Sequence, residues 1–259
     1  MSRKEYSFDV DKNIIAKGLA SVKYMGPKIS DELYELSKQK TYSRYMELLA
    51  DIFAHTSVDT RQIDILIKLD FFSEFGNQRE LLRLTDLFIE FFKKGDVKMV
   101  RRDGIDGTWL GEIVARHSTS TTKNGSEAKS YTIQNLSSIL FECEDYIKAA
   151  KLEDLPLKTK IQNTVEYLGY LGYQSGREED RPLLYVREVF PLKRRSDGKQ
   201  FGYSVSTKSI GSGIETKFTV RNSVFDKEPI RTDDIIYCKK WMRDQRGYFN
   251  LLDYEHRIM

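Results

Sequence analysis

The sequence predicts an α+β protein with several domains, in which an all-α N-terminal part precedes a C-terminal β-barrel of five strands. Apolar residues recur every three or four positions up to about residue 94, which is the period of a helix, and alternate with polar residues after residue 181, which is the period of a strand. The length of 259 residues also exceeds that of one ordinary domain. We therefore expect a helical domain (1–94), a β-hairpin and loop insert (95–132), a helical connector (133–180) and the barrel domain (181–259).

Helical periodicity begins early in the N-terminal domain. Ile14 and Ile15 open the first apolar-periodic stretch. The strongest amphipathic pattern runs from Glu80 to Phe92, where leucine and phenylalanine recur at helical spacing. Gly95 follows the lysine-rich end of that segment, as expected of a residue that ends a helix.

The insert has a different character. Asp-Gly pairs at Asp103 and Asp106 indicate turns. Ile113 and Val114 alternate with polar neighbours, and residues 117–129 are rich in serine, threonine and glycine. This pattern predicts one or two β-hairpins with an exposed tip, after which the chain returns to helix in the connector.

Short segments with alternating apolar residues follow residue 181, and turn-forming residues separate them. Five short strands favour a small closed barrel, and the oligonucleotide-binding (OB) fold is a five-stranded barrel of this kind. The long gap at 221–234 lies between the third and fourth strands, where an OB fold often carries a helix or irregular loop. The expected strands are 184–190, 201–207, 214–220, 235–242 and 248–252.

Composition excludes several classes of protein. The chain is 40% hydrophobic and 31% charged, which is a globular composition, and no apolar run approaches the ~20 residues of a membrane span. The charged N-terminus has no signal-peptide core, so we expect a cytoplasmic protein. Cys143 and Cys238 are far apart and the three histidines are scattered, which excludes a disulfide scaffold and a cysteine-rich zinc site.

The sequence contains no recognisable catalytic constellation. It has no phosphate-binding loop, dinucleotide fingerprint or nucleophile elbow. The acidic pairs Asp103/Asp106 and Asp233/Asp234 lie in glycine turns or just before a strand, where such residues usually serve the turn. We therefore predict no catalytic residue, no metal site, no cofactor and no small-molecule substrate.

A short turn at Gly26 is the first candidate binding site. Pro27 suits the first position of the helix that follows the turn. Between residues 12 and 28 there are four lysines and no acidic residue. Such a turn can present backbone N–H groups to a phosphate, and the alternative is an ordinary helical corner with solvated lysines. The candidate residues for contact with duplex DNA are Lys17, Lys23, Gly26 and Lys28.

The segment from Ile15 to Gly26 (IAKGLASVKYMG) resembles the start of the tandem helix-hairpin-helix domain in the alpha subunit of bacterial replicative DNA polymerase III. Residues 63–73 (IDILIKLDFFS) look like the second hairpin of that family, and residues 76–82 (GNQRELL) look like the element after it. The resemblance covers most of 14–94.

The resemblance resumes in the C-terminal part. Residues 166–170 (EYLGY) are similar to the helix that leads into the family's OB domain, and residues 232–236 (TDDII) are similar to a late turn and strand of that domain. It implies a helix-hairpin-helix domain, a connector and an OB domain in the order of that polymerase. The three palm carboxylates that hold two metal ions in the family have no counterpart here. The resemblance thus implies part of a DNA-directed DNA polymerase, a nucleotidyltransferase, without its catalytic site.

Two departures from the family pattern concern the hairpins. Tyr24 stands where the first hairpin has glycine, and Asp70 stands where the second has glycine. Aspartate tolerates the left-handed conformation better than most residues, but its charge repels phosphate. We therefore expect the second hairpin to be structural. The insert has no counterpart in the family pattern.

The barrel domain carries a second candidate site. Residues 181–221 contain nine basic and three acidic residues. Several of the basic residues fall on the hairpin between the first two strands, a loop with which OB folds bind oligonucleotides. Tyr185 and Tyr203 stack on bases if they face outward and belong to the core if they face inward, and alternation leaves both possibilities open. The candidate hairpin residues are Lys193, Arg194, Arg195 and Lys199.

Two functions follow from these observations. The first is a non-catalytic, DNA-binding portion of a polymerase III alpha-like protein, which holds duplex backbone and single-stranded template in DNA replication. The alternative is a replisome interaction module that binds the sliding clamp or its loader and has incidental DNA affinity. Gln134 and the apolar residues after it loosely match a clamp-binding peptide, and an amphipathic helix explains them better.

Overall fold

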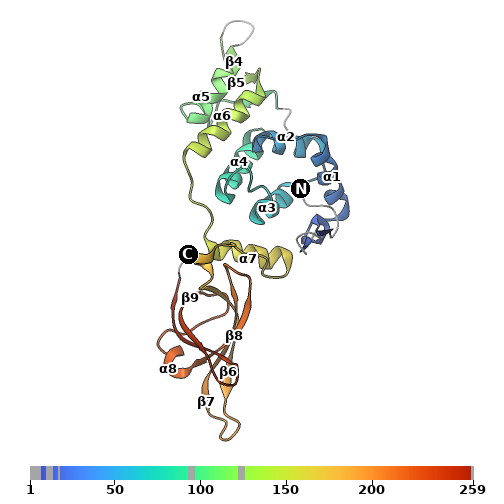
Figure 1. The fold of residues 1–259 in the computed structure, drawn as a ribbon. Coiled ribbons are helices and arrows are strands. Elements are labelled where there is room, and N and C mark those ends of the chain that lie inside the picture. The colour runs from blue at the N-terminus through green and yellow to red at the C-terminus, as the bar shows by residue number, and fades with distance from the viewer. Residues whose placement is uncertain (1–6, 10–13, 17, 93–96, 122–125, 258–259) are drawn as a thin grey trace. The chain divides into compact units, whose positions relative to one another are not determined.

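The computed structural model describes residues 7–9, 14–16, 18–92, 97–121 and 126–257 (Figure 1). The chain divides into two units, Met1–Leu155 and Pro156–Met259. The division falls inside the segment predicted as a connector. None of the helices in the described ranges has the length and apolar character that a membrane span requires.

A group of helices forms the first part of the N-terminal unit, as the periodicity predicts. Local caps define where two of them begin. The side chain of Asp59 accepts a hydrogen bond from the backbone N–H of Gln62, whose own side chain bonds back to Asp59, and Asn77 and Glu80 form the same capping box. The elements are a 3₁₀ helix η1 (Leu19–Ser21), α1 (Pro27–Gln39), α2 (Tyr45–His55), α3 (Thr60–Lys68) and α4 (Gln78–Phe91).

The chain upstream of η1 contains a β-ribbon, so the prediction of helix from the first apolar residues was wrong. Strands β1 (Ser7–Asp9) and β2 (Ile14–Ala16) pair antiparallel. Two adjacent β-branched isoleucines favour a strand over a helix. A single apolar pair fits both periods, so periodicity alone does not distinguish them.

Helix α6 (Leu136–Ala149) completes the helical packing of this unit against α2 and α4. Its Glu144 is fully buried. The Glu144 carboxylate accepts hydrogen bonds from the backbone N–H groups of Tyr45 (3.2 Å) and Met46 (3.0 Å) and pairs with Lys148 Nζ at 2.7 Å. Glu144 therefore caps the N-terminus of α2 from another helix, because α2 has no side-chain cap of its own.

The predicted insert combines a small sheet with a helix. Ile113 and Val114 lie in the helix, so the prediction of β-structure there was wrong. Leu110, three residues before Ile113, completes a helical apolar face, and Thr108 caps the helix by accepting from the N–H of Gly111. The predicted hairpin is present, and its tip at 122–125 lies outside the described residues. The elements are β3 (Met99–Arg101), α5 (Trp109–Arg116), β4 (Ser118–Thr121) and β5 (Glu127–Ile133), with sheet order β3-β5-β4.

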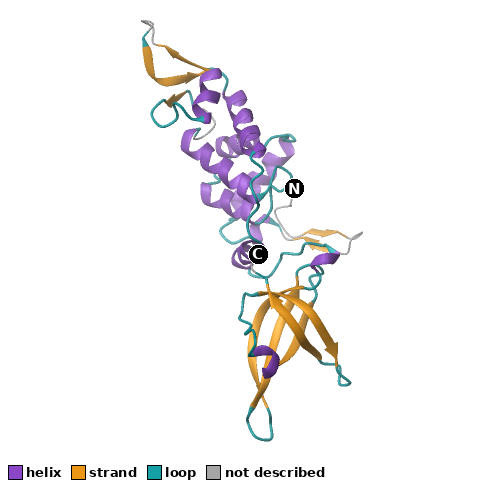
Figure 2. Ribbon diagram, turned by 90° about the vertical axis from the view of Figure 1, so that its left-hand side faces the viewer, coloured by secondary structure: helices purple, strands orange, loops and turns teal. Residues whose placement is uncertain are grey.

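The C-terminal unit is a closed five-stranded barrel, which confirms the predicted fold class (Figure 2). The strand order is β10-β8-β7-β6-β9, in which β8 and β10 are parallel and the other pairs are antiparallel. A short helix, α8, follows the third strand, where the gap in the sequence predicted a helix or loop. The elements are β6 (Leu183–Lys193), β7 (Gln200–Ser209), β8 (Glu215–Arg221), α8 (Asn222–Phe225), β9 (Ile235–Arg243) and β10 (Phe249–His256).

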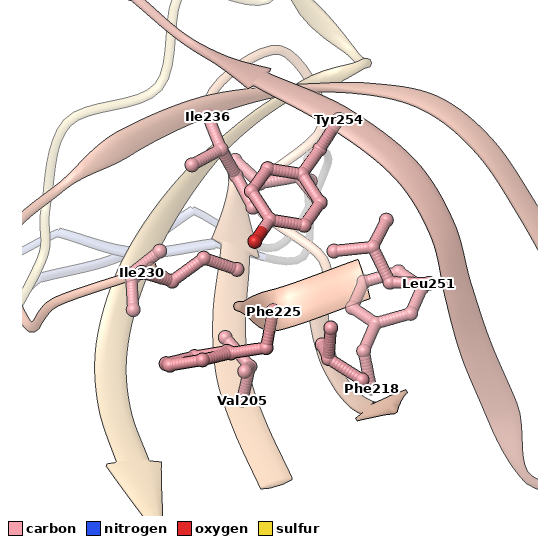
Figure 3. Close-up of a cluster of buried hydrophobic side chains, with 10 residues drawn as sticks. Val205, Phe218, Phe225, Ile230, Ile236, Leu251 and Tyr254 are labelled. Carbon is pink, nitrogen blue, oxygen red and sulfur yellow. The ribbon is translucent and has the colours of Figure 1, made fainter. Parts of the chain in front are cut away.

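Two apolar clusters lie on opposite faces of β6. Leu184 and Val186 point into the barrel and join the interior cluster, part of which Figure 3 shows. Leu183 and Tyr185 point outward and pack against Ile161 of α7 (Leu157–Leu168). The helix thus covers an outer face of the barrel that strand alternation alone would leave to solvent.

Candidate nucleic-acid interface

The turn between η1 and α1 has the predicted form. Gly26 precedes α1 as its N-cap and Pro27 is the first helical residue. A Cβ at Gly26 would meet no atom within 4 Å, so this side of the backbone faces open space. Among the described residues, none in the first turn of α1 is acidic and none caps it with a side chain, so its N-terminal N–H groups remain available to an anion.

Basic side chains gather at this turn around one aromatic ring. Tyr24 is 43% exposed, the guanidinium carbon of Arg61 lies 3.7 Å from its ring centroid, and Lys23 Nζ lies 5.2 Å from it. Lys28 is exposed and forms an i,i+4 pair with Glu32 at 3.6 Å. We call Lys23, Tyr24, Lys28 and Arg61 the hairpin cluster. Lys17 lies outside the described residues.

Arg61 was not anticipated from the sequence. It begins α3, far along the chain from Tyr24, and no local pattern connects the two residues. Neither Arg61 nor Lys23 has a carboxylate partner within the described part of the chain. As far as the described ranges extend, their charges are therefore available to an external anion.

Both positions that depart from the family's glycines take the left-handed conformation. Tyr24 has φ +69° and Asp70 has φ +58°. The turn at Asp70 is held by backbone bonds to Ile67 and Leu66, and the neighbouring Phe72 is buried against Tyr45. The two turns thus share a backbone conformation, while the second one is anchored in the core.

The barrel has a groove on the outer face of β7 and β8, between the β6–β7 hairpin and the β9–β10 hairpin. Its volume is about 770 Å³. We call it the barrel groove. Phe201 and Tyr248 line it with exposed fractions of 37% and 63%, and Phe249 lines it half-buried. Its basic lining residues are Arg194, Lys217, Arg221 and Arg246.

The barrel groove has a strongly positive electrostatic character. None of its four cations has an ion-pair partner among the residues that the structure describes. Asp244 is the acidic lining residue, and its Oδ1 accepts hydrogen bonds from the backbone N–H groups of Arg246 and Tyr248. That carboxylate therefore stabilises the β9–β10 turn. The groove combines free cations with exposed rings, which suits a polyanion that carries planar bases.

The predicted hairpin cations are all exposed, and one of them lines the groove. Lys193 ends β6, while Arg194, Arg195 and Lys199 lie in the turn that follows. Arg194 donates its backbone N–H to the carbonyl of Lys199 at 2.9 Å, which closes the turn. Arg194 lines the barrel groove. The other cations extend the positive charge along the hairpin beyond it.

The two predicted tyrosines belong to packed regions. Tyr185 is 4% exposed beneath α7, and its hydroxyl donates a hydrogen bond to Asp233, so it is a core residue and offers no stacking surface. Burial, with that hydrogen bond, raises the pKa of Tyr185 well above its usual range. Tyr203 is half-buried and stacks on Phe225, with ring centroids 3.6 Å apart, at the edge of the interior cluster. The exposed rings of the groove are instead Phe201 and Tyr248.

The sequence analysis did not anticipate that the β9–β10 hairpin forms one side of the barrel groove. Arg246, Tyr248 and Phe249 line the groove opposite Arg194, although about fifty residues separate them in sequence. The available signal was the basic and aromatic character of the turn after the fourth predicted strand. No group of three or more metal-ligating side chains occurs within the described ranges.

Comparison with protein families finds a match over the region that contains the first of these surfaces. A family model described as a helix-hairpin-helix motif matches residues 1–82, which include the whole hairpin cluster. Comparison with curated proteins finds no match. A helix-hairpin-helix region followed by a closed five-stranded barrel is compatible with nucleic-acid binding.

Proposed function

We propose that this chain is a non-catalytic DNA-binding portion of a polymerase III alpha-like protein that acts in DNA replication. The hairpin cluster holds the backbone of a duplex, and the barrel groove holds single-stranded template. The observation that carries the proposal is the barrel groove, which exposed rings line together with four cations that have no ion-pair partner among the described residues. The contacts are sequence-independent, because phosphate contacts position a protein on DNA without reading bases.

The groove supports single-strand binding through two physical effects. Its cations neutralise phosphates and release counterions. Phe201 and Tyr248 offer π-faces, and base–aromatic stacking stabilises a bound strand by about 1–3 kcal/mol per base whatever the sequence. A duplex keeps its bases stacked inside the helix, so in this groove it gains only the neutralisation of its phosphates and no stacking on the aromatic rings.

The hairpin cluster supports duplex binding through backbone and charge. The N-terminus of α1 has no side-chain cap, Gly26 has open space where a Cβ would lie, and the side chains of Lys23 and Arg61 lie over the ring of Tyr24, two residues before Gly26. This arrangement suits one phosphate and its neighbour along the strand. Changing Lys23 and Lys28 to glutamine should weaken duplex binding and reduce the salt slope by up to about two, at roughly 0.9 per lost phosphate contact.

A variant that lacks three of the groove's positive charges tests whether the barrel groove binds single-stranded DNA. The variant changes Lys217, Arg221 and Arg246 to glutamine in the full chain, and binding to a labelled oligo-dT of about 12 nucleotides is measured by fluorescence anisotropy across about 50–200 mM salt. If each cation contacts one phosphate, the slope of log K against log salt should fall by about two, at roughly 0.7 per contact. Affinity at low salt should fall with it.

A matched control removes the same net charge elsewhere on the C-terminal unit. Lys158, Lys227 and Arg231 are exposed and outside the groove, and their change to glutamine should leave the slope nearly unchanged. Equal effects from the two variants would mean that only net charge matters. Tight binding with no salt dependence in the wild type would contradict the proposal.

The exposed apolar side chains of the barrel favour a second candidate function. Ile214, Met242 and Phe190 are 64%, 48% and 54% exposed. Such residues suit contact with a sliding clamp, a clamp loader or another replisome protein. This function is the better one if the chain binds such a protein at a salt concentration where the oligonucleotide no longer binds.

A further inference from the structure

A second cleft opens at the end of the barrel, next to the groove. Its volume is about 490 Å³. The strand edges there are incompletely paired, because β8 pairs with β10 only at Phe218 and Thr219, while residues 240–243 of β9 pair with β10 alone. We call this cleft the barrel mouth. Apolar side chains dominate its lining, among them Ile214, Phe218, Trp241 and Phe249.

Phe249 belongs to both the barrel mouth and the barrel groove, so the two share a wall. Its ring lies edge-on to Phe218, with centroids 6.2 Å apart, and tilted to Trp241 at 5.4 Å. Trp241 ends this aromatic row on the outside and is 53% exposed. A bound strand that passes Phe249 in the groove therefore meets Trp241 next.

Cations flank Trp241 along β9. The guanidinium carbon of Arg243 lies 5.5 Å from the ring centroid of Phe249, and Arg243 Nε donates to the carbonyl of Gly247. Lys240 is exposed and has no ion-pair partner within the described ranges. The exposed indole of Trp241 lines the barrel mouth together with Lys240, and Arg243 lies over the adjacent ring of Phe249. This surface, next to a positive groove, has the features of a stacking site for a base whose phosphates lie beside it.

We propose that Trp241 is the stacking platform for a base of a single strand that leaves the barrel groove and crosses the barrel mouth. The inference rests on the proposed single-strand role of the groove and extends it by a second subsite. The ligand is a single-stranded oligonucleotide without sequence preference, since every base has a π-face. A strand that fills only the groove does not reach Trp241.

Tryptophan fluorescence tests this subsite directly. The chain has two tryptophans, so changing Trp109 to phenylalanine leaves Trp241 as the sole indole emitter. Trp109 lies in the other unit, stacked on Tyr146. Titration with oligo-dT of about 12 nucleotides should quench the emission to saturation, whereas an oligomer of about 4 nucleotides, at the lower end of OB site sizes, should quench it much less.

Affinity measurements complete the test. Trp241→Ala should weaken binding of the longer oligomer about tenfold, the effect of one lost stack, and Trp241→Phe should retain most of the affinity because it keeps a ring. Met242→Ala is the matched control, since Met242 is exposed to a similar extent and points to the other face of β9. It should bind like wild type.

The possible outcomes distinguish failure of the Trp241 subsite from failure of single-strand binding in the barrel groove. Full affinity in Trp241→Ala together with unquenched Trp241 emission, while the longer oligomer still binds, would overturn the subsite and leave the groove intact. Equal losses in Trp241→Ala and Met242→Ala would also overturn it, because the effect would then be local distortion. No binding of either oligomer at low salt would remove the proposed function and the subsite together.

Discussion

Replacing Tyr24 with glycine should separate folding stability from duplex binding. Tyr24 holds φ +69°, and the left-handed conformation costs a non-glycine residue about 1–2 kcal/mol. Glycine removes that strain. It also removes the contact with Arg61, which contributes about 0.5–1 kcal/mol at an exposed site, and it adds about 0.4–1 kcal/mol of chain entropy to the unfolded state. These effects nearly cancel, so the free energy of unfolding should change by less than about 1 kcal/mol.

Duplex binding should respond differently. Without the ring, Arg61 loses the aromatic surface against which its guanidinium lies, 3.7 Å from the ring centroid. Its phosphate contact then becomes less favourable, so the salt slope of duplex binding should fall by up to about 0.9 and the affinity at low salt should fall several-fold. Arg61→Gln should give the same loss of slope, because it removes the same contact.

The assay pairs urea unfolding with duplex anisotropy on the same proteins. Asp70→Gly is the matched control, since Asp70 has a similar φ of +58° in the turn that is anchored in the core. It should leave the duplex salt slope unchanged. Destabilisation of the Tyr24→Gly variant by several kcal/mol would contradict this prediction, as would a stable variant that binds duplex like wild type.

Other predictions concern charge, burial and catalysis. Glu144→Ala should destabilise the fold by about 3 kcal/mol in urea unfolding, because it leaves two buried N–H groups unpaired, and a loss below about 1 kcal/mol would show that water replaces the carboxylate. Changing Lys193, Arg194 and Arg195 to glutamate should abolish oligo-dT binding in anisotropy and leave Tm nearly unchanged, since all three are exposed. Burial, with a hydrogen bond to Asp51, raises the pKa of Tyr42 to about 12. The protonated hydroxyl therefore contributes fully to folding stability below about pH 10, and this contribution is lost as the pH rises toward 12. Tyr42→Phe should make the alkaline decline of Tm shallower in thermal melts. Primer extension with Mg²⁺ should detect no nucleotide incorporation by the chain alone, and template-dependent incorporation would contradict a non-catalytic role.

The barrel was predictable from sequence because residues 201–207 and 214–220 alternate clearly between apolar and polar side chains, and turn residues separate the five short segments. The helix-hairpin-helix region was predictable because Gly26 and Pro27 carry local turn chemistry. The failures at Ile14 and Ile113 have a common cause. A pair of adjacent apolar residues fits both a helix and a strand, and the pairing of β1 with β2 or the cap at Thr108 decides between them.

The candidate site was less predictable than the fold. The β6–β7 hairpin was evident from its charge, but the barrel groove needs the β9–β10 hairpin, which barrel closure brings opposite it. Tyr185 has an outward-pointing side chain, and only the packing of α7 over that face buries it. Arg61, at the start of α3, reaches the ring of Tyr24 only in the folded chain. Such contacts between distant segments leave no local pattern in the sequence.

The capping of α2 by Glu144 has a consequence for synthesis on the ribosome. Helices α1 to α4 are complete once Phe91 has left the ribosome. The N–H groups of Tyr45 and Met46 stay without their hydrogen-bond acceptor until Glu144, more than fifty residues later, has also been synthesised. At about 5–20 residues per second, the delay is roughly 3–10 s. During that time the apolar faces that α6 will cover on α2 and α4 are open to solvent or to a chaperone. A pause in translation between α4 and α6 would extend this interval and should increase aggregation of the nascent chain, although the mature protein would have the same sequence and fold.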